Sequence, residues 1–545
     1  MPVFSFSAAC FASLSTKTYG TNNGPLKSSV YGNNDSVTYN YNNLGLKSSI
    51  VKTDVETGKP NVTSSYLWSY TSTGVTQSHT DTVNNRKYLY DYDSLGRLIR
   101  QEIQTNDASA AHIGSTEVTY DTRNNVTKVV NEFDGYPVVD EYLYSENSGN
   151  ANAVSYARDN LISRYYIANT TSRYVDYFYD SLNRLNKKSL VIGTKTINSD
   201  YSYKTAVKHN EGSSEKKYKT TQLGREILDN TAYSYYYDVA GNITDIKLST
   251  RSAPDTMSAY RSYTYDSKNQ LLSETITKKD SNNNNVTTKT EFAYDDIGNI
   301  SSKKVIAGTN TTTIAYNYGK DSNAGWNHIL TAVNLDGDLN SDGTPNYETD
   351  ETIEYDAIGN PTKYLGATLT WNGRELTGYK KGTSDIKYTY DVDGLRTSKD
   401  NNGEKSTYYY VSGQLRYETR GNLKFYYFYD ASGNLSAIRY YDASCTAHAY
   451  FVLTNQQGDI ISLYNNNGVL VASYEYDAWG NCTITKDTDG IAALNPIRYR
   501  GYYYDSETDL YYLQSRYYNP QVGRFLNADD RIIDDSASFE FNPFS

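Results

Sequence analysis

Residues 90–98 read YDYDSLGRL. The phrase recurs along the chain as an alternating, mostly aromatic pair, an acid or amide, two or three spacers, a Gly or Asn, and an apolar residue that opens another alternating stretch. Eleven copies in all are beyond chance, so the repeat decides the fold. The other ten copies begin at Tyr39, Val118, Tyr177, Tyr235, Tyr263, Phe292, Ile353, Tyr388, Tyr427 and Tyr474.

The acidic positions of these copies define the period of the repeat. Asp93 and Asp121 are 28 residues apart, whereas Asp121 and Asp180 are 59 apart, about twice the basic step. Degenerate copies lie inside the long gaps, such as YLYS at Tyr142 and YSYK at Tyr201. The repeat therefore spans nearly the whole chain, and we expect a repeat architecture instead of several separate domains.

Each copy has the pattern of a β-hairpin. The alternation places both aromatic rings on one face of a strand, and the Asp or Asn that follows can bond to the backbone two residues on and start a turn. Gly or Asn three residues later supplies the positive φ that closes the turn, and a second strand follows. Because one hairpin is marginal alone, neighbours must pair. We predict an all-β protein with one continuous antiparallel sheet that curls around a cavity.

Tyrosine is the dominant aromatic residue, with 59 copies against 13 Phe and 4 Trp. A tyrosine ring stacks on its cross-strand neighbours, while its hydroxyl tolerates water, which suits a sheet that faces a wet cavity or solvent. We interpret the tyrosines as structural rungs of the sheet. A glycan-binding surface made of the same rings is the alternative.

Composition excludes some classes of function. The chain has 52 Lys and Arg against 63 Asp and Glu, a net charge of −11, and no basic stripe, so nucleic acid is not an expected partner. No apolar run approaches the ~18 residues of a spanning helix, so no membrane span is expected. The opening MPVFSFSAAC has no basic residue before Lys17, and we expect the chain to begin part-way through a longer gene product.

The carboxyl-terminal stretch NPIRYRGYYYDSETDLYYLQSRYYNPQVGRFLNADD, residues 495–530, together with the YDxxGxL units, resembles the Rhs/YD-repeat family and its Rhs-repeat-associated core. That family includes bacterial polymorphic toxins, the C component of insecticidal toxin complexes, and the YD shell of teneurins. The resemblance implies a spiral β-sheet that forms a hollow shell. It divides the chain into an irregular segment (1–18), a YD-repeat shell (19–494), a core that closes the shell (495–530) and a short variable tail (531–545).

The resemblance also implies a function. We expect the structural shell of a secreted or surface-exposed bacterial toxin-delivery protein that encapsulates or presents a toxin domain. Only 15 residues follow Asp530, so the payload itself is not expected in this chain. The alternative is a cell-surface adhesion or carbohydrate-binding protein, teneurin-like or wall-associated, whose partner is a receptor or glycan. No cofactor is expected.

In several members of the family the core resembles an aspartyl autoprotease, which implies Arg516 and Asp529 as catalytic candidates here. Such chemistry needs a second carboxylate of different pKa, and the family pattern places none on Asp530, Asp534 or Asp535. The alternative is that Arg516 and Arg524 hold acids in structural ion pairs. We expect both arginines to be buried and self-cleavage to be weak or absent. The expected structural core residues are Arg524, Tyr517, Tyr518, Gly523 and Phe525.

One short motif suggests a metal. In DLNSDG, residues 338–343, the side chains of Asp338, Asn340 and Asp342 match positions one, three and five of an EF-hand calcium loop. Position twelve falls on Thr349 instead of Glu, so the bidentate ligand is missing. A solvated insertion between two strands is the better interpretation, and we expect no metal site.

Overall fold

The computed structural model describes residues 15–20, 24–31, 36–53, 62–71, 74–144, 161–168, 170–208, 216–253, 256–319, 329–348 and 351–527. Within these ranges the regular structure consists of 42 strands, one short helix, α1 (Ile491–Leu494), and one 3-10 turn, Tyr499–Gly501. The strands form antiparallel sheets of successive hairpins. The predicted all-β class is therefore confirmed. In the described part of the chain no helix is long and apolar enough to span a bilayer.

The strands fall into three sheets. The first sheet contains β1 (Ser15–Tyr19), β2 (Leu26–Tyr31), β3 (Ser36–Tyr41), β4 (Lys47–Thr53), β5 (Val62–Thr71), β6 (Gly74–Asp81), β7 (Arg86–Asp93), β8 (Leu98–Thr105), β9 (His112–Tyr120), β10 (Val126–Phe133), β11 (Tyr136–Tyr144), β12 (Ile162–Tyr166), β13 (Arg173–Tyr179), β14 (Leu185–Ile192), β15 (Lys195–Lys208), β16 (Lys216–Leu228), β17 (Thr231–Tyr237), β18 (Ile243–Thr250), β19 (Met257–Tyr265), β20 (Leu271–Lys279), β21 (Asn285–Tyr294), β22 (Ile300–Ala307), β23 (Asn310–Gly319) and β24 (Ile329–Asn334). The second contains β25 (Ile353–Tyr355), β26 (Pro361–Tyr364), β27 (Ala367–Asn372), β28 (Glu375–Lys381), β29 (Ser384–Tyr390), β30 (Arg396–Asn401), β31 (Glu404–Val411), β32 (Gln414–Arg420), β33 (Leu423–Tyr429), β34 (Leu435–Tyr441), β35 (Ala447–Thr454), β36 (Ile460–Asn465), β37 (Leu470–Tyr476) and β38 (Cys482–Asp487). The third contains β39 (Tyr503–Asp505), β40 (Leu510–Tyr512), β41 (Tyr517–Asn519) and β42 (Arg524–Phe525).

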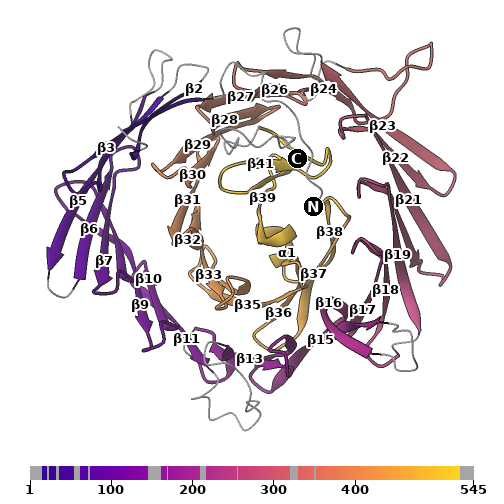
Figure 1. Ribbon diagram of the computed structural model, residues 1–545, viewed down its shortest axis with the longest axis horizontal. Helices are drawn as coiled ribbons and strands as arrows, with labels where there is room; N and C mark the ends of the chain where they lie inside the picture. Colours follow the sequence, from indigo (N-terminus) through magenta and orange to yellow (C-terminus); the bar gives the residue numbers. More distant parts are fainter. Residues whose placement is uncertain are drawn as a thin grey trace.

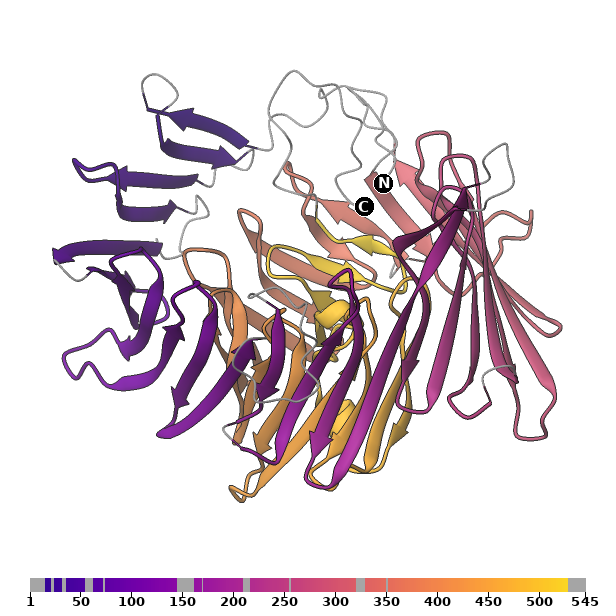
Figure 2. The same ribbon diagram turned by 60° about the horizontal axis from the view of Figure 1, so that its bottom comes forward.

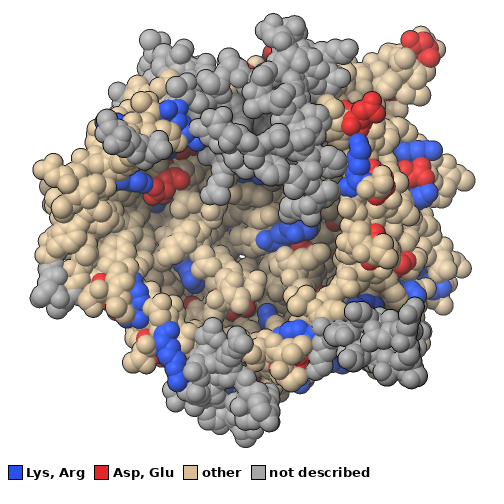
Figure 3. All heavy atoms as spheres, viewed as in Figure 1, with Lys and Arg blue, Asp and Glu red and all other residues tan. Residues whose placement is uncertain are grey.

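The two long sheets form a nested spiral. The first sheet curves around the outside of the molecule, the second curves inside it, and α1 with β39 and β41 lies at the centre (Figure 1). We call the first sheet the outer coil, the second the inner coil, and residues 495–527 the core segment. Figure 2 shows the inner coil, in orange to yellow, enclosed between two arms of the outer coil. This arrangement is the expected spiral shell, and its face is hollowed in the middle (Figure 3).

One detail of the expected sheet differs. The sheet is not continuous, because it breaks between β24 and β25, where a single bridge between Ala332 and Thr352 connects the two coils. The intervening residues bond among themselves, as when the backbone N–H of Asn346 donates to the carbonyl of Asp338. Such local bonds compete with the strand ladder. The break lets the chain leave the outer coil and begin the inner one.

The inner face of the outer coil packs on the outer face of the inner coil, and we call this contact the seam. One hydrophobic cluster joins buried residues of β7–β16 to buried residues of β32–β36. Across the seam the rings of Phe133 and Tyr417 stack with centroids 5.0 Å apart. Aromatic pairs of this kind add to the free energy of burial. A second cluster joins the inner coil to β21–β24 and to the core segment, so the core segment fills the inner coil.

The repeated phrase folds into the same loop each time, here called the YD loop. The carboxylate Oδ1 of Asp93 accepts the backbone N–H groups of Leu95 and Arg97 at 2.9 and 3.0 Å. The N–H of Gly96 closes the loop on the carbonyl of Asp93 at 2.9 Å, and Gly96 has φ 75°. A left-handed residue is inexpensive only for Gly or Asn. The predicted acid-initiated, glycine-closed turn is therefore confirmed.

The second tyrosine of most phrases has a role that the sequence did not reveal, although the hydroxyl of Tyr92 bonds instead to the side chain of Gln77. The hydroxyl of Tyr294 on β21 donates to the backbone carbonyl of Leu271, the residue that opens β20, at 2.8 Å. Instead of facing water, this hydroxyl ties one YD loop to the hairpin before it. Phenylalanine cannot make this bond. The same bond is made by Tyr41, Tyr120, Tyr144, Tyr179, Tyr203, Tyr237, Tyr265, Tyr318, Tyr355, Tyr390 and Tyr476.

Candidate functional site

The core segment lies at the centre of the inner coil and is the best candidate for a functional site. Its first residues follow α1, which ends at Leu494. Its four short strands β39–β42 form a small sheet of their own. Because this sheet does not pair with either coil, side chains must hold it in place.

A buried ion pair provides the first anchor. The guanidinium of Arg396 on β30 bonds to both carboxylate oxygens of Asp505 on β39, at 2.5 and 3.1 Å, and both side chains are 0% exposed. Lys399, from the same strand, bonds to Asp505 at 2.9 Å and to Glu507 at 2.9 and 3.0 Å. Burial alone would raise the pKa of the Asp505 carboxyl, but Arg396 and Lys399 more than offset it and hold this pKa below its ordinary value. The two cations therefore favour the charged form of Asp505.

Arg396 is enclosed by aromatic rings as well as by Asp505. Its guanidinium lies 4.4 Å from the ring centroid of Tyr512 and 5.0 Å from that of Tyr503, both in the core segment. A cation over a desolvated ring face is attracted by the ring quadrupole. The hydroxyl of Tyr517 bonds to that of Tyr390 at 2.8 Å and lies 3.3 Å from Arg396. Tyr517 thus belongs to the group of rings that encloses Arg396.

A second anchor uses the neighbouring strands of the inner coil. The buried carboxylate of Glu418 on β32 accepts the hydroxyl of Tyr503 at 2.7 Å and the Nε of Arg420 at 2.5 Å. Arg420 in turn donates to the backbone carbonyl of Leu494, at the end of α1, at 2.6 Å. Burial opposes ionisation of Glu418, but Arg420 holds the pKa of this carboxyl below its ordinary value. This anchor fixes the start of the core segment.

The far end of the core segment is held by both coils. Arg524 is buried, as expected, and donates to the hydroxyl of Tyr318 on β23 at 3.1 Å. The hydroxyl of Tyr518 donates to the carbonyl of Trp479 at 2.8 Å. Gly523 has φ 75°, and a Cβ there would lie 3.1 Å from the Trp479 ring. Tyr518, Gly523 and Arg524 therefore all contact residues of the two coils in the structure.

The catalytic candidates are only partly covered by the structure. Arg516 is half-buried, not buried as expected, and its guanidinium stacks on the ring of Phe525 at 3.6 Å from the centroid. This stacking also assigns Phe525 a structural role. Asp529 and Asp530 lie outside the described residues. The pairing of Arg516 with Asp529 stays a prediction.

The calcium candidates lie in the connection between the two coils. Asn340 starts a loop that resembles a YD loop, because the N–H of Gly343 bonds to its carbonyl at 2.9 Å. The carboxylate of Asp342 accepts the N–H of Thr344 at 2.9 Å, and the N–H of Asp338 bonds to Asp336. Among the described residues no group of three or more acidic, His or Cys side chains is arranged to hold a metal ion.

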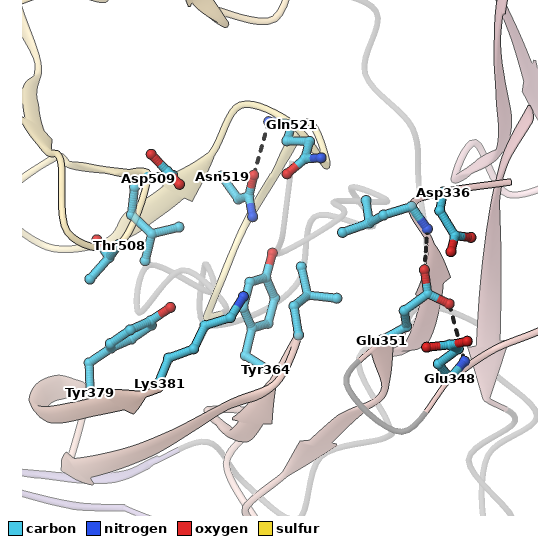
Figure 4. A pocket seen from close by; sticks show the side chains of 13 residues that line it. Asp336, Glu348, Glu351, Tyr364, Tyr379, Lys381, Thr508, Asp509, Asn519 and Gln521 are labelled. Atoms are coloured by element: carbon cyan, nitrogen blue, oxygen red, sulfur yellow. Dashed lines mark hydrogen bonds between the residues drawn. The ribbon is translucent and has the colours of Figure 1, made fainter. Parts of the chain in front are cut away.

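A pocket of about 270 Å³ opens beside this connection. Tyr364, Tyr379 and Lys381 line it from the inner coil, and Asp509, Asn519 and Gln521 line it from the core segment (Figure 4). Asp336, Glu348 and Glu351 complete the wall from the connection. The Glu351 carboxylate accepts the backbone N–H of Leu335 at 2.5 Å, so this acid holds the connection in place.

The anchor residues Arg396, Asp505, Glu418 and Arg420 were not predicted from the sequence. One signal could have found Arg396: it is the fifth residue after the acid of its YD loop, a position occupied by Leu98, Ile243 and Ile300 in other copies. A charge at a buried apolar position requires a partner. No comparable signal in the sequence identifies that partner as Asp505.

The fold and the anchored core segment define a β-spiral shell built from YD repeats. The family model described as Teneurin YD-shell matches residues 289–543, slightly under half of the chain. The resemblance to the Rhs/YD-repeat family is therefore confirmed.

Similarity to curated proteins and to a solved structure supports this family resemblance. The tRNA nuclease WapA of Bacillus subtilis (strain 168) is 37% identical over 292 residues, which are 52% of this chain and 11% of WapA. Teneurin-m of Drosophila melanogaster is 23% identical over 81% of this chain and 15% of its own length. The chain thus spans about a tenth of the length of such relatives. The crystal structure of TcdB2-TccC3-Cdc42 superposes with a TM-score of 0.68 at 17% identity, covering 97% of this chain and 27% of that chain, which shows a common fold.

Proposed function

We propose that this chain is the structural shell of a secreted or surface-exposed toxin-delivery protein, and that it encapsulates or presents a payload attached after the core segment. The shell fold supports the proposal, as does the similarity to WapA, a protein named as a tRNA nuclease. The shell would act as a container, and the toxic chemistry would belong to the payload.

One observation carries this proposal. Leu526 and Asn527, the last described residues of the core segment, are each 1% exposed. The carbonyl of Tyr517 accepts the N–H of Leu526 at 2.9 Å, and Tyr316 on the outer coil donates to the carbonyl of Val522 at 3.0 Å. The chain at this point is therefore held inside the spiral. We infer that a polypeptide continuing from Asn527 would start from a buried position in the spiral.

The proposal is tested with an unstructured peptide that carries an epitope, fused after Ser545. The matched control carries the same peptide in the exposed loop at Asp280–Asn284. We expect antibody to capture the control readily but the fusion only after denaturation. Equal capture of both native proteins would refute encapsulation. Binding of the unfused shell to a glycan array would instead favour the adhesion or carbohydrate-binding alternative.

The proposed self-cleavage near Asp529 depends on chemistry separate from the shell. It would need Arg516 and Asp529 together with a second carboxylate, and Arg516 stacks on Phe525 in the structure. We therefore propose that cleavage is weak or absent and that Arg516 is a packing residue.

A further inference from the structure

The seam contains buried acidic residues that the anchors of the core segment do not use. Two of them, Glu226 on β16 and Glu274 on β20, lie on the outer coil and are 0% and 3% exposed. Each faces an acid-bearing loop of the inner coil, residues 455–459 for Glu226 and residues 477–481 for Glu274. Each has one carboxylate oxygen, Oε1, that is buried and has no hydrogen-bond partner among the described residues.

Burial and the carboxylate of Asp459 oppose the ionisation of Glu226, whereas its hydrogen-bond donors and Lys188 favour it. Its Oε2 accepts the hydroxyl of Tyr235 on β17 at 2.9 Å. From the inner coil the backbone N–H of Gln456 and the carboxylate of Asp459 face it, and from β14 the ammonium of Lys188 does so. Lys188 also lies 3.8 Å from a carboxylate oxygen of Asp430 and is shared between the two acids. The other titratable groups near Glu226 are Tyr201, Tyr233 and Tyr237.

The surroundings of Glu274 are similar. From the inner coil the backbone N–H of Ala478 donates to its Oε2 at 3.5 Å, and the carboxylate of Asp477 faces it. From β19 it faces Arg261 and Tyr263. The guanidinium of Arg261 also donates to the carbonyl of Tyr476 at 2.7 Å. Tyr265 is the remaining titratable neighbour.

A buried glutamate thus faces a second acid across the seam at two places; Asp459 is buried there as well, whereas Asp477 is half-buried. A carboxylate in such a site is more stable when it carries its proton. The proton removes the repulsion and gives the oxygen a hydrogen to donate. We propose that the contact between the outer coil and the last part of the inner coil is a proton-controlled latch, closed when Glu226 and Glu274 are protonated and loosened when they ionise.

The direction of the pH dependence follows from burial. Burial raises the pKa of the Glu226 carboxyl from its ordinary 4.5 to about 7. Repulsion by the carboxylate of Asp459 across the seam contributes to this rise. Burial likewise raises the pKa of Glu274, reinforced by Asp477. A folded state that binds the proton more tightly than the unfolded chain is stabilised by it below the unfolded pKa. The closed seam is therefore most stable in acid, and this stabilisation is lost as the pH rises through about 7.

Loosening of the latch would affect the core segment, because the inner-coil loops at residues 455–459 and 477–481 also contact the core segment. Asp459 accepts the N–H of Arg500 at 2.8 Å, and Asn481 donates to the carbonyl of Pro520 at 3.0 Å. Ionisation of the two glutamates would therefore weaken the support of the core segment from outside. A shell closed in acid would open its central part in neutral or alkaline medium.

Hydrogen exchange of the full 545-residue chain tests the latch. Exchange of peptides that cover residues 223–237 and 474–482 is followed from about pH 5 to about pH 8.5 and corrected for the intrinsic effect of pH. A rise in pKa from 4.5 to about 7 predicts that seam opening increases by roughly 100-fold. Glu226→Gln combined with Glu274→Gln should remove this dependence in the same peptides. Glu354→Gln, at a position whose side chain is 57% exposed, should behave like the wild type.

Two results would overturn the inference: corrected exchange in the wild type that does not change with pH, or glutamine variants that keep the full dependence. Circular dichroism checks that the variants fold. Infrared spectroscopy of the wild type gives a test that needs no variant, because a protonated carboxyl has its own carbonyl band. Absence of that band at about pH 6, where ordinary carboxyls are ionised, would refute the latch by itself.

Discussion

Replacement of Asp505 by Asn should release the core segment from the inner coil. The substitution removes the charge that faces Arg396 and Lys399, which are 0% and 7% exposed, and leaves Arg396 without a compensating acid. Breaking a buried ion pair by removing one partner costs about 3–5 kcal/mol. Glu507, 29% exposed, offsets part of this through Lys399 but makes no bond to Arg396. We therefore expect a loss of about 3 kcal/mol in the free energy of local opening.

The assay is hydrogen exchange of peptides that cover β39 and β40. A loss of about 3 kcal/mol predicts exchange roughly 100-fold faster in Asp505→Asn than in the wild type. The matched control is Glu354→Gln, which breaks the pair between Glu354 and Lys363, both 57% exposed. Exposed pairs contribute about 0–1 kcal/mol. If both variants changed exchange in these peptides equally little, the buried pair would not anchor the core segment.

Two further predictions concern single side chains. Tyr294→Phe removes the hydroxyl that ties β21 to Leu271 and should lower the free energy of unfolding in denaturant by about 1–2 kcal/mol. The control Tyr136→Phe, at a position 54% exposed, should leave this free energy almost unchanged. Equal losses in the two variants would show that the hydroxyl bond is not a structural element. Expressed with a tag at each end, the chain should release no small carboxyl-terminal fragment by mass spectrometry. Efficient cleavage that Asp529→Asn and Arg516→Ala each abolish would show an active autoprotease instead.

Sequence was sufficient for the repeating part of the fold because the repeat is local. In the loop at Asp93 the acid, the spacers and Gly96 all lie within five residues, and their bonds are made within the same loop. Alternation of tyrosines fixed the face of each strand. The role of the second hydroxyl, as at Tyr294, was missed because its acceptor lies on the preceding hairpin, 23 residues away.

Contacts across the spiral could not be predicted, because they join residues that are far apart in the chain. Arg396 and Asp505 are 109 residues apart, and Glu274 meets Ala478 across 204 residues. The outer and inner coils are built from the same repeat and could pack on each other in many relative positions. The periodicity of the repeat does not select one of them. The break between the coils was missed for a different reason. The DLNSDG segment offered the backbone local partners, which a pattern of strands does not reveal.

Thiol labelling at the end of the core segment tests most directly the claim that the chain leaves the core inside the shell. With Cys10, Cys445 and Cys482 replaced by Ser, single cysteines are introduced as Asn527→Cys, where the native residue is 1% exposed, and as Asn282→Cys in an exposed loop. We predict that the cysteine at position 527 reacts about 100-fold more slowly than that at 282 in the native protein, and equally fast after unfolding. Equal rates in the native protein would contradict the account.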